Sequence, residues 1–245
     1  MVRQPIEKTI SSNKFLEVAF MNMAVNHSIT SIRETGEIVG DPMEIKLFEF
    51  GEYEITHDHE HDPEVIFEFG SKRGHHGVVL KRFDFDSQLF RMSTIAKSNI
   101  TGEDCFIYTK GSPEAMLKIF RSESVPKDYE ETLKEYASHG FRVLAIGSRR
   151  IKEEEFKFER LEVERDLEFN GFEVFENRLK PETKEGIKNL HDAEIPTVMI
   201  TGDNALTGSN ISLECKIADT SKKMYIYDYK ENKLVCEDFN YTPSN

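Results

Sequence analysis

One short stretch of the chain combines a lysine, a glycine and a helix-starting sequence in an order that suits phosphate binding. It reads Lys110-Gly111-Ser112-Pro113-Glu114 and follows the apolar run Cys105-Phe106-Ile107-Tyr108. Ser112 suits a helix N-cap and Pro113 the first helical position, so the pattern predicts strand, tight turn and helix. Lys110 could supply a point charge for phosphate, and Gly111 could let a ligand approach the backbone. The alternative is a solvated lysine at a strand end, which the stretch by itself favours.

An aromatic side chain and an arginine could complete such a site. The run Phe83-Asp84-Phe85-Asp86-Ser87 ends a predicted strand, and we expect one phenylalanine to face the core and the other to be more exposed. An exposed ring near the lysine could stack on a purine, whereas the alternative is a partly buried strand phenylalanine. Arg142 lies in an otherwise apolar strand. It is either a snorkelling edge residue or a contact to phosphate or ribose.

Two acidic positions lie at predicted helix starts. Asp41-Pro42-Met43-Glu44 resembles a capping box, which explains Glu44 without a ligand. Thr201-Gly202-Asp203 follows an apolar run and precedes a helix, and ligands of open α/β sheets bind at such positions. An aspartate there suits an anionic ligand only if a metal ion bridges the charges.

A second possible metal site is the run His57-Asp58-His59-Glu60-His61-Asp62. The three histidines alternate, so an extended chain would place them on one side. The segment is polar and loop-like, however, and a solvated loop with adventitious metal affinity is the favoured interpretation. His27 and His139 are each alone in the sequence and are expected to be structural.

The periodicity predicts an antiparallel sheet with helices, an α+β domain, over about residues 14–170. Helices are expected at residues 14–25, 43–50, 115–120 and 126–138, and strands at residues 64–69, 76–85, 91–96, 104–109, 141–146 and 167–175. Residues 152–165 are highly charged and are expected to be a solvated helix or loop.

A different pattern begins at residue 177. A helix at 181–191, a buried strand at 195–200 and a helix at 204–217 are typical of a parallel α/β sheet, of which only part is present. Residues 224–239 are expected to form a hairpin. The predicted organisation is a lead-in at 1–13, a first domain at 14–172, a partial second domain at 173–219 and a hairpin-like insert or tail at 220–245.

Composition excludes some classes of partner. The 245 residues carry 32 Lys and Arg against 45 Asp and Glu, a net charge of -13. A general nucleic-acid surface or a direct contact with an anionic membrane is therefore not expected. No apolar run approaches the roughly 20 residues of a membrane span.

The order of these motifs resembles the large cytosolic loop of P-type ATPases, over about residues 14–219. The GDPMEIKLFE and NRLKPET forms are most similar to the fifth class, the polyamine-transporting or orphan branch. The stretches that carry the resemblance are Asp41-Pro42-Met43-Glu44, Phe85 ahead of Arg91-Met92-Ser93, Lys110-Gly111-Ser112-Pro113-Glu114, Gly140-Phe141-Arg142-Val143-Leu144-Ala145, Glu176-Asn177-Arg178-Leu179-Lys180-Pro181-Glu182-Thr183 and Thr197-Val198-Met199-Ile200-Thr201-Gly202-Asp203-Asn204.

The resemblance implies a nucleotide-binding domain at 14–172. It also implies part of a phosphorylation domain at 173–219, with the Rossmann-like fold of haloacid dehalogenases. Phe85 would stack on adenine, Lys110 would lie near the phosphates, and Gly111 would let the nucleotide approach. Further contacts to base, ribose or phosphate would come from Glu44, Ser87 and Arg142. The transferred phosphate and its magnesium would meet Thr201, Gly202 and Asp203. The implied cofactors are thus ATP and Mg²⁺.

The resemblance also implies partners and a location. The chain would work with an actuator, the remaining phosphorylation domain and membrane helices of a parent pump. That parent would lie in an intracellular membrane, endosomal, lysosomal or related, with this part facing the cytosol.

The departures from the family pattern limit the expected activity. The chain lacks the Asp-Lys-Thr-Gly-Thr motif, whose aspartate is phosphorylated, and the later Gly-Asp-Gly-x-Asn-Asp motif. We therefore expect ATP binding without turnover. Two alternatives stay open, a freestanding dehalogenase-like phosphohydrolase and a non-catalytic interaction module that does not bind nucleotide. Asn26 stands where members of the class often have cysteine, and the sequence does not explain that change.

Overall fold

A computed structural model describes residues 14–32, 34–57, 65–102, 104–176, 179–202, 205–219, 221–230 and 233–239. The chain divides into two compact units. The first comprises Met1–Pro126 and Leu144–Glu173, and the second comprises Lys127–Val143 and Val174–Asn245. No helix in the described part of the chain is long and apolar enough to cross a membrane.

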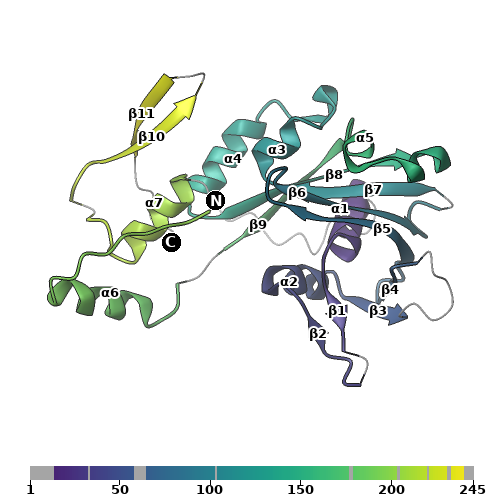
Figure 1. The fold of residues 1–245 in the computed structure, drawn as a ribbon, viewed down its shortest axis with the longest axis horizontal. Helices are drawn as coiled ribbons and strands as arrows, with labels where there is room; N and C mark the ends of the chain where they lie inside the picture. Colours follow the sequence, from purple (N-terminus) through teal and green to yellow (C-terminus); the bar gives the residue numbers. More distant parts are fainter. Residues whose placement is uncertain are drawn as a thin grey trace. The chain divides into compact units, whose positions relative to one another are not determined.

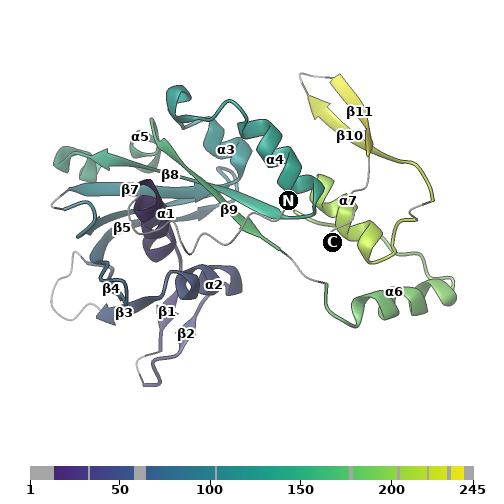
Figure 2. The same cartoon turned by 180° about the vertical axis from the view of Figure 1, so that it is seen from behind.

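The first unit is built on a seven-stranded sheet with strand order β3-β4-β5-β6-β7-β8-β9, seen from two sides in Figures 1 and 2. Neighbouring strands from β3 to β8 pair antiparallel, and an antiparallel sheet is what the periodicity predicts for this part of the chain. The strands are β3 (Tyr53–His57), β4 (Phe67–Ser71), β5 (His76–Asp86), β6 (Arg91–Ser98), β7 (Cys105–Gly111), β8 (Arg142–Ile151) and β9 (Glu168–Phe175).

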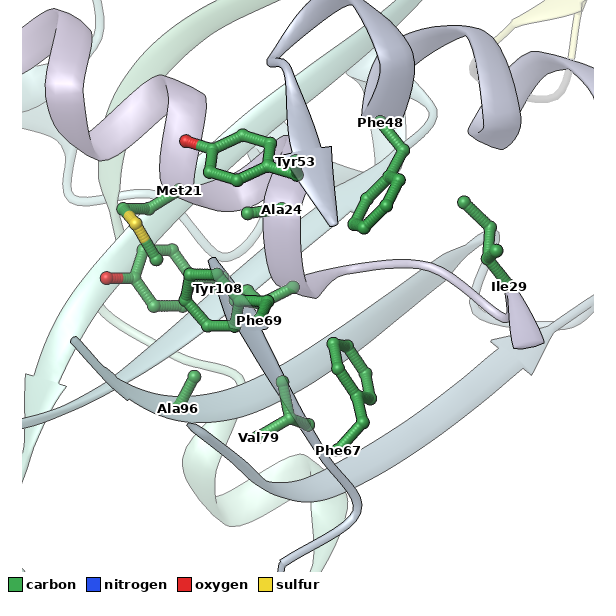
Figure 3. Close-up of a cluster of buried hydrophobic side chains, with 11 residues drawn as sticks. Met21, Ala24, Ile29, Phe48, Tyr53, Phe67, Phe69, Val79, Ala96 and Tyr108 are labelled. Atoms are coloured by element: carbon green, nitrogen blue, oxygen red, sulfur yellow. The ribbon is translucent and has the colours of Figure 1, made fainter. Parts of the chain in front are cut away.

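Two helices cover one face of this sheet, α1 (Lys14–Val25) and α2 (Pro42–Phe50). Between them and the strands lies an apolar cluster that includes phenylalanine and tyrosine rings (Figure 3). The buried members come from α1, the segment that follows it, α2 and strands β3 to β7, so the cluster joins elements that are distant in sequence. They are Met21, Ala24, Val25, Ile29, Phe48, Tyr53, Phe67, Phe69, Val79, Ala96 and Tyr108.

Polar side chains fix α1 on the sheet. The Asn22 amide donates to the carbonyl oxygens of Thr109 (3.1 Å) and Gly147 (3.4 Å), on β7 and β8. The Asn26 amide donates to the Asn22 side chain (3.1 Å) and to the carbonyl of Met92 on β6 (3.4 Å). Asn26, whose presence the sequence leaves unexplained, therefore holds the end of α1 against the sheet.

Shorter elements complete the first unit. They are the pair β1 (Thr30–Ser31) and β2 (Ile38–Val39), helices α3 (Pro113–Leu117) and α5 (Arg160–Val163), and 3-10 turns at Ser122–Ser124 and Glu153–Lys157. Ser112 caps α3 as predicted, because its Oγ accepts from the amide of Ala115 at 3.2 Å. The sequence pattern did not predict β1, β2 or β3.

The second unit contains α4 (Tyr129–Ser138), α6 (Thr183–Asp192), α7 (Ala205–Glu214) and the antiparallel hairpin β10 (Met224–Lys230) and β11 (Lys233–Phe239). The Asn210 amide on α7 donates to the carbonyls of Ala137 (3.2 Å) and Ser138 (2.7 Å), which ties α7 to the end of α4. The three helices and the hairpin follow the sequence prediction.

The predicted strand at residues 195–200 is wrong. These residues form neither helix nor strand, and the side chains of Val198 and Ile200 are 84% and 94% exposed. A parallel strand exists only beside other strands that satisfy its backbone groups. The described residues of this unit supply none next to this segment, so the expected α/β sheet is represented by its helices alone.

Candidate functional site

Lys110 lies near the end of β7, in the interior of the sheet. It pairs with Met92 on β6 and with Ile146 on β8, and only 7% of its surface is exposed. Its Nζ donates to Oε1 of Glu44 on α2 at 2.8 Å. The alternative of a solvated strand-end lysine is therefore wrong, because this ammonium is buried and has one carboxylate as its counter-ion.

Glu44 has three hydrogen-bond donors around its carboxylate. Besides Lys110, the backbone N–H and the hydroxyl of Ser28 donate to Oε2 at 2.9 and 2.8 Å. Burial raises the pKa of Glu44, but the charge of Lys110 and these hydrogen bonds outweigh burial, so the pKa lies below its usual value. Glu44 is ionised at neutral pH.

The capping-box interpretation of Glu44 needs correction. Asp41 does cap α2, since its side chain accepts from the amides of Met43 (2.9 Å) and Glu44 (3.3 Å). The Glu44 side chain bonds to Ser28 and Lys110 instead of completing the box. The local sequence pattern predicted the wrong hydrogen-bond partner for the Glu44 side chain. Its actual partners, Ser28 and Lys110, are distant along the chain.

Phe85 is exposed, with 62% of its surface accessible, so the alternative of a partly buried strand phenylalanine is wrong. It lies where the register between β5 and β6 shifts, between the pairs Phe83–Ser93 and Asp86–Arg91. These pairs bracket Met92, which itself pairs with Lys110. Phe85 and Lys110 are thus two strands apart, about 10 Å between backbones at ordinary strand spacing.

Gly111 and Ser87 complete the predicted set in the first unit. A Cβ at Gly111 would lie 2.5 Å from the carbonyl oxygen of Phe90 and 2.6 Å from Cβ of Arg91. The close approach of β6 therefore requires a glycine there whether or not a ligand binds. Ser87 is exposed in the turn that follows β5. A ligand role for either residue remains a prediction.

The other predicted site residues lie in the second unit. Arg142 is exposed at the start of β8. Thr201 and Gly202 are exposed ahead of α7, and Asp203 lies outside the described residues. Their ligand roles stay predictions.

The histidine-rich run is not described beyond the backbone of His57, so its metal interpretation is untested. Elsewhere in the described ranges no group of three or more His, Cys, Asp or Glu could hold a metal ion. His27 is structural as predicted. Its ring is buried, with Nε2 2.8 Å from the carbonyl of Ala24 and Nδ1 accepting from the amide of Ile29.

Sequence reasoning missed a buried polar network on the other face of the sheet. Glu164, at the end of α5, has a side chain with 0% exposure and accepts from Arg91 Nε (2.6 Å), Ser93 Oγ (2.6 Å) and Arg160 Nε (2.8 Å). Residues 152–165 are thus not simply a solvated charged stretch, as predicted. Nothing local in that run of charges distinguishes the buried members.

The chain is similar to transport ATPases. A family model described as P-type ATPase, cytoplasmic domain N, matches residues 12–182. The vacuolar cation-transporting ATPase YPK9 of Saccharomyces cerevisiae is 34% identical over 251 residues, covering 88% of this chain and 17% of that protein. The probable cation-transporting ATPase 13A5 of Homo sapiens is 36% identical over 224 residues, covering 85% and 18%.

A third relative is named for the substrate that it transports. The polyamine-transporting ATPase 13A3 of Mus musculus is 28% identical over 283 residues, covering 97% of this chain and 22% of that protein. The chain spans about a fifth of the length of these relatives.

Proposed function

Because the chain belongs to the P-type ATPases, in the region described as cytoplasmic domain N, we propose that it binds ATP for a membrane pump. The observation that carries the proposal is an exposed aromatic ring, Phe85, two strands from the buried ammonium of Lys110. An apolar platform and a cation at that separation suit the two ends of a nucleotide.

Each residue would have a separate task. The face of Phe85 would stack on adenine, and the Lys110 ammonium would meet the phosphates. Since Oε1 of Glu44 accepts from Nζ of Lys110 at 2.8 Å, the phosphates would compete with that carboxylate or share the ammonium with it. Gly111, Ser87 and Arg142 are proposed to contact base, ribose or phosphate.

Mg²⁺ would arrive with the nucleotide and neutralise part of the phosphate charge. In the second unit, Thr201, Gly202 and Asp203 are proposed to meet the transferred phosphate and its metal ion. Because the sequence has no Asp-Lys-Thr-Gly-Thr motif, we propose that the chain alone binds ATP without turning it over.

We also propose the setting of this activity. The names of the relatives include cation and polyamine transport and a vacuolar pump. The parent protein would move a cation or polyamine across an intracellular membrane, endosomal, lysosomal or related, with this part facing the cytosol. Its partners would be an actuator, the remaining phosphorylation domain and the membrane helices of the same pump.

The test is an ATP titration followed by amide NMR on the wild type and two variants. We expect a dissociation constant on the order of 1 mM, with shifts that cluster around Phe85 and Lys110. Phe85→Ala should weaken binding about tenfold, because it removes the stacking surface. Phe90→Ala is the matched control. Phe90 is 56% exposed near the end of the same hairpin, and its replacement by alanine should leave the affinity for ATP unchanged.

The alternatives predict different results. An interaction module would fold normally and show no ATP-dependent shift. A freestanding phosphohydrolase would release phosphate. Shifts located away from Phe85 and Lys110, or equal affinity in the wild type and Phe85→Ala, would contradict the proposal.

A further inference from the structure

Arg160 connects the two strands of the hairpin that carries Phe85. Its Nη1 donates to the carbonyl oxygen of Asp84 on β5 at 2.8 Å, and its Nη2 donates to the carbonyl oxygen of Arg91 on β6 at 2.6 Å. Its Nε donates to Oε1 of Glu164 at 2.8 Å. One guanidinium therefore links β5, β6 and the end of α5.

The contact on β5 lies at the irregular point of the strand. Between the pairs Phe83–Ser93 and Asp86–Arg91, two residues of β5 face one residue of β6, which is a β-bulge. A bulge disrupts the ladder and leaves a carbonyl in need of another donor. Arg160 supplies that donor to Asp84, whose carbonyl belongs to the same peptide group as the amide nitrogen of Phe85.

The guanidinium is itself held rigidly. Only 17% of the Arg160 side chain is exposed, and its partner Glu164 also accepts from Arg91 and Ser93. Ser93 points to the opposite face of β6 from Met92, whose neighbour on β7 is Lys110. Arg160 thus acts from the face away from Lys110, outside the proposed ligand contacts.

We propose that Arg160 is a positioning residue for Phe85: it holds the Asp84–Phe85 peptide in the bulge so that the ring stays exposed and fixed for a purine. The proposal rests on the proposed ATP binding, in which Phe85 is the stacking surface. A planar fork is needed to reach both carbonyls and the carboxylate together, which neither lysine nor glutamine can provide.

The first test follows the ring without any nucleotide. The chain contains no tryptophan, so Phe85→Trp introduces a single tryptophan, whose fluorescence can be excited separately from that of the tyrosines. We expect Arg160→Gln in this background to lower the fluorescence anisotropy of Trp at position 85, because the bulge loosens. Arg149→Gln is the matched control. Arg149 is similarly buried and pairs with Glu155 at 2.7 Å, and its hydrogen bonds go to β8 and the 153–163 region.

The second test is a double-mutant cycle on ATP affinity. Arg160→Gln should weaken ATP binding three- to tenfold in the wild type and cause no further loss in Phe85→Ala. Inorganic triphosphate, which has no base to stack, should bind equally well to the wild type and to Arg160→Gln. Arg149→Gln should change neither affinity.

The results separate this inference from the proposed function. Unchanged anisotropy, or equal losses of ATP affinity with and without Phe85, would overturn the positioning role. A wild type that binds no ATP would overturn the proposed function even if the anisotropy falls as expected. Should Arg160→Gln fail to give a cooperative thermal transition, Arg160→Lys, which keeps a charge for Glu164, is measured in the same two assays against the same criteria.

Discussion

At the scale of single residues, Glu173 on β9 is the least satisfied side chain of the first unit. It is 3% exposed, and neither carboxylate oxygen has a hydrogen-bond partner among the described residues. Burial raises its pKa to about 7, the charge of Lys110 lowers it and the charge of Glu44 raises it. The ion pair of the candidate site is thus electrostatically linked to a carboxyl group that titrates near neutral pH.

Because the pKa of Glu173 is raised, the free energy of unfolding depends on pH. Between the ordinary value of 4.5 and about 7, the folded chain binds a proton at Glu173 that the unfolded chain does not, so this contribution to stability falls as pH rises. Glu173→Gln removes it. We expect the free energy of unfolding of Glu173→Gln, relative to wild type, to be about 2 kcal/mol higher at pH 7.5 than at pH 5.

Urea denaturation at the two pH values measures this difference, and other titrating groups cancel because both proteins share them. His27 is one of these groups, because burial lowers its pKa to about 4. Between pH 4 and the ordinary pKa of 6.5, the contribution of His27 to stability therefore rises with pH, opposite to that of Glu173. Glu168→Gln is the control, because Glu168 belongs to the same strand but is exposed. An effect of Glu173→Gln that is equal at pH 5 and pH 7.5 would show that the carboxyl group does not titrate in this range.

At the scale of elements, the seating of α1 depends on amide groups rather than on apolar contact alone. Asn22 is fully buried and donates to carbonyl oxygens of two strands, 87 and 125 residues away in sequence. The donor is essential because a carbonyl oxygen can only accept. Replacing the amide nitrogen by oxygen would therefore place like partial charges in contact inside the protein.

Asn22→Asp changes this one atom and should lower the free energy of unfolding by about 3 kcal/mol, because a buried acceptor or carboxylate would lose its partners. Asn99→Asp is the matched control. The Asn99 amide donates to the carbonyl of Gly74 at 2.9 Å, but the residue is exposed and water can replace the lost bond. Urea midpoints measure both variants, and equal effects would mean that α1 does not depend on the Asn22 donor.

The same elements show what sequence can predict. The helices α1 and α2, strands β4 to β9 and the β10–β11 hairpin follow from local periodicity, caps and turn residues. Phe85 and Lys110 could be proposed because motifs recur in a known order. The pairing of Glu44 with Lys110 and the contact of Arg160 with Asp84 could not, because these partners are 66 and 76 positions apart in the sequence. The bulge at Phe85 could not either, because it depends on the register between β5 and β6, which local periodicity does not give.

At the scale of the whole chain, the two units differ in how completely they bury their apolar residues. The first has the aromatic cluster beneath α1 and α2. In the second, α6 has no buried residue, and Ile195, Val198 and Ile200 are 49%, 84% and 94% exposed. The failed strand prediction at 195–200 has the same cause. The apolar run is suited to a sheet interior, but among the described residues β10 and β11 of this unit pair only with each other, and no strand pairs with residues 195–200.

An exposed run of β-branched residues is a template for pairing with a second chain. We therefore expect the wild type to self-associate as its concentration rises. The double variant Val198→Lys, Ile200→Lys should stay monomeric, because like charges in the run of each chain oppose the pairing of two such segments. Static light scattering over a concentration series measures the weight-average mass of each. Leu161→Lys is the control: Leu161 is also exposed, at 64%, but it lies on the short helix α5 and cannot extend a strand. A wild type that stays monomeric, or a double variant that associates like the wild type, would show that residues 195–200 are not the adhesive segment.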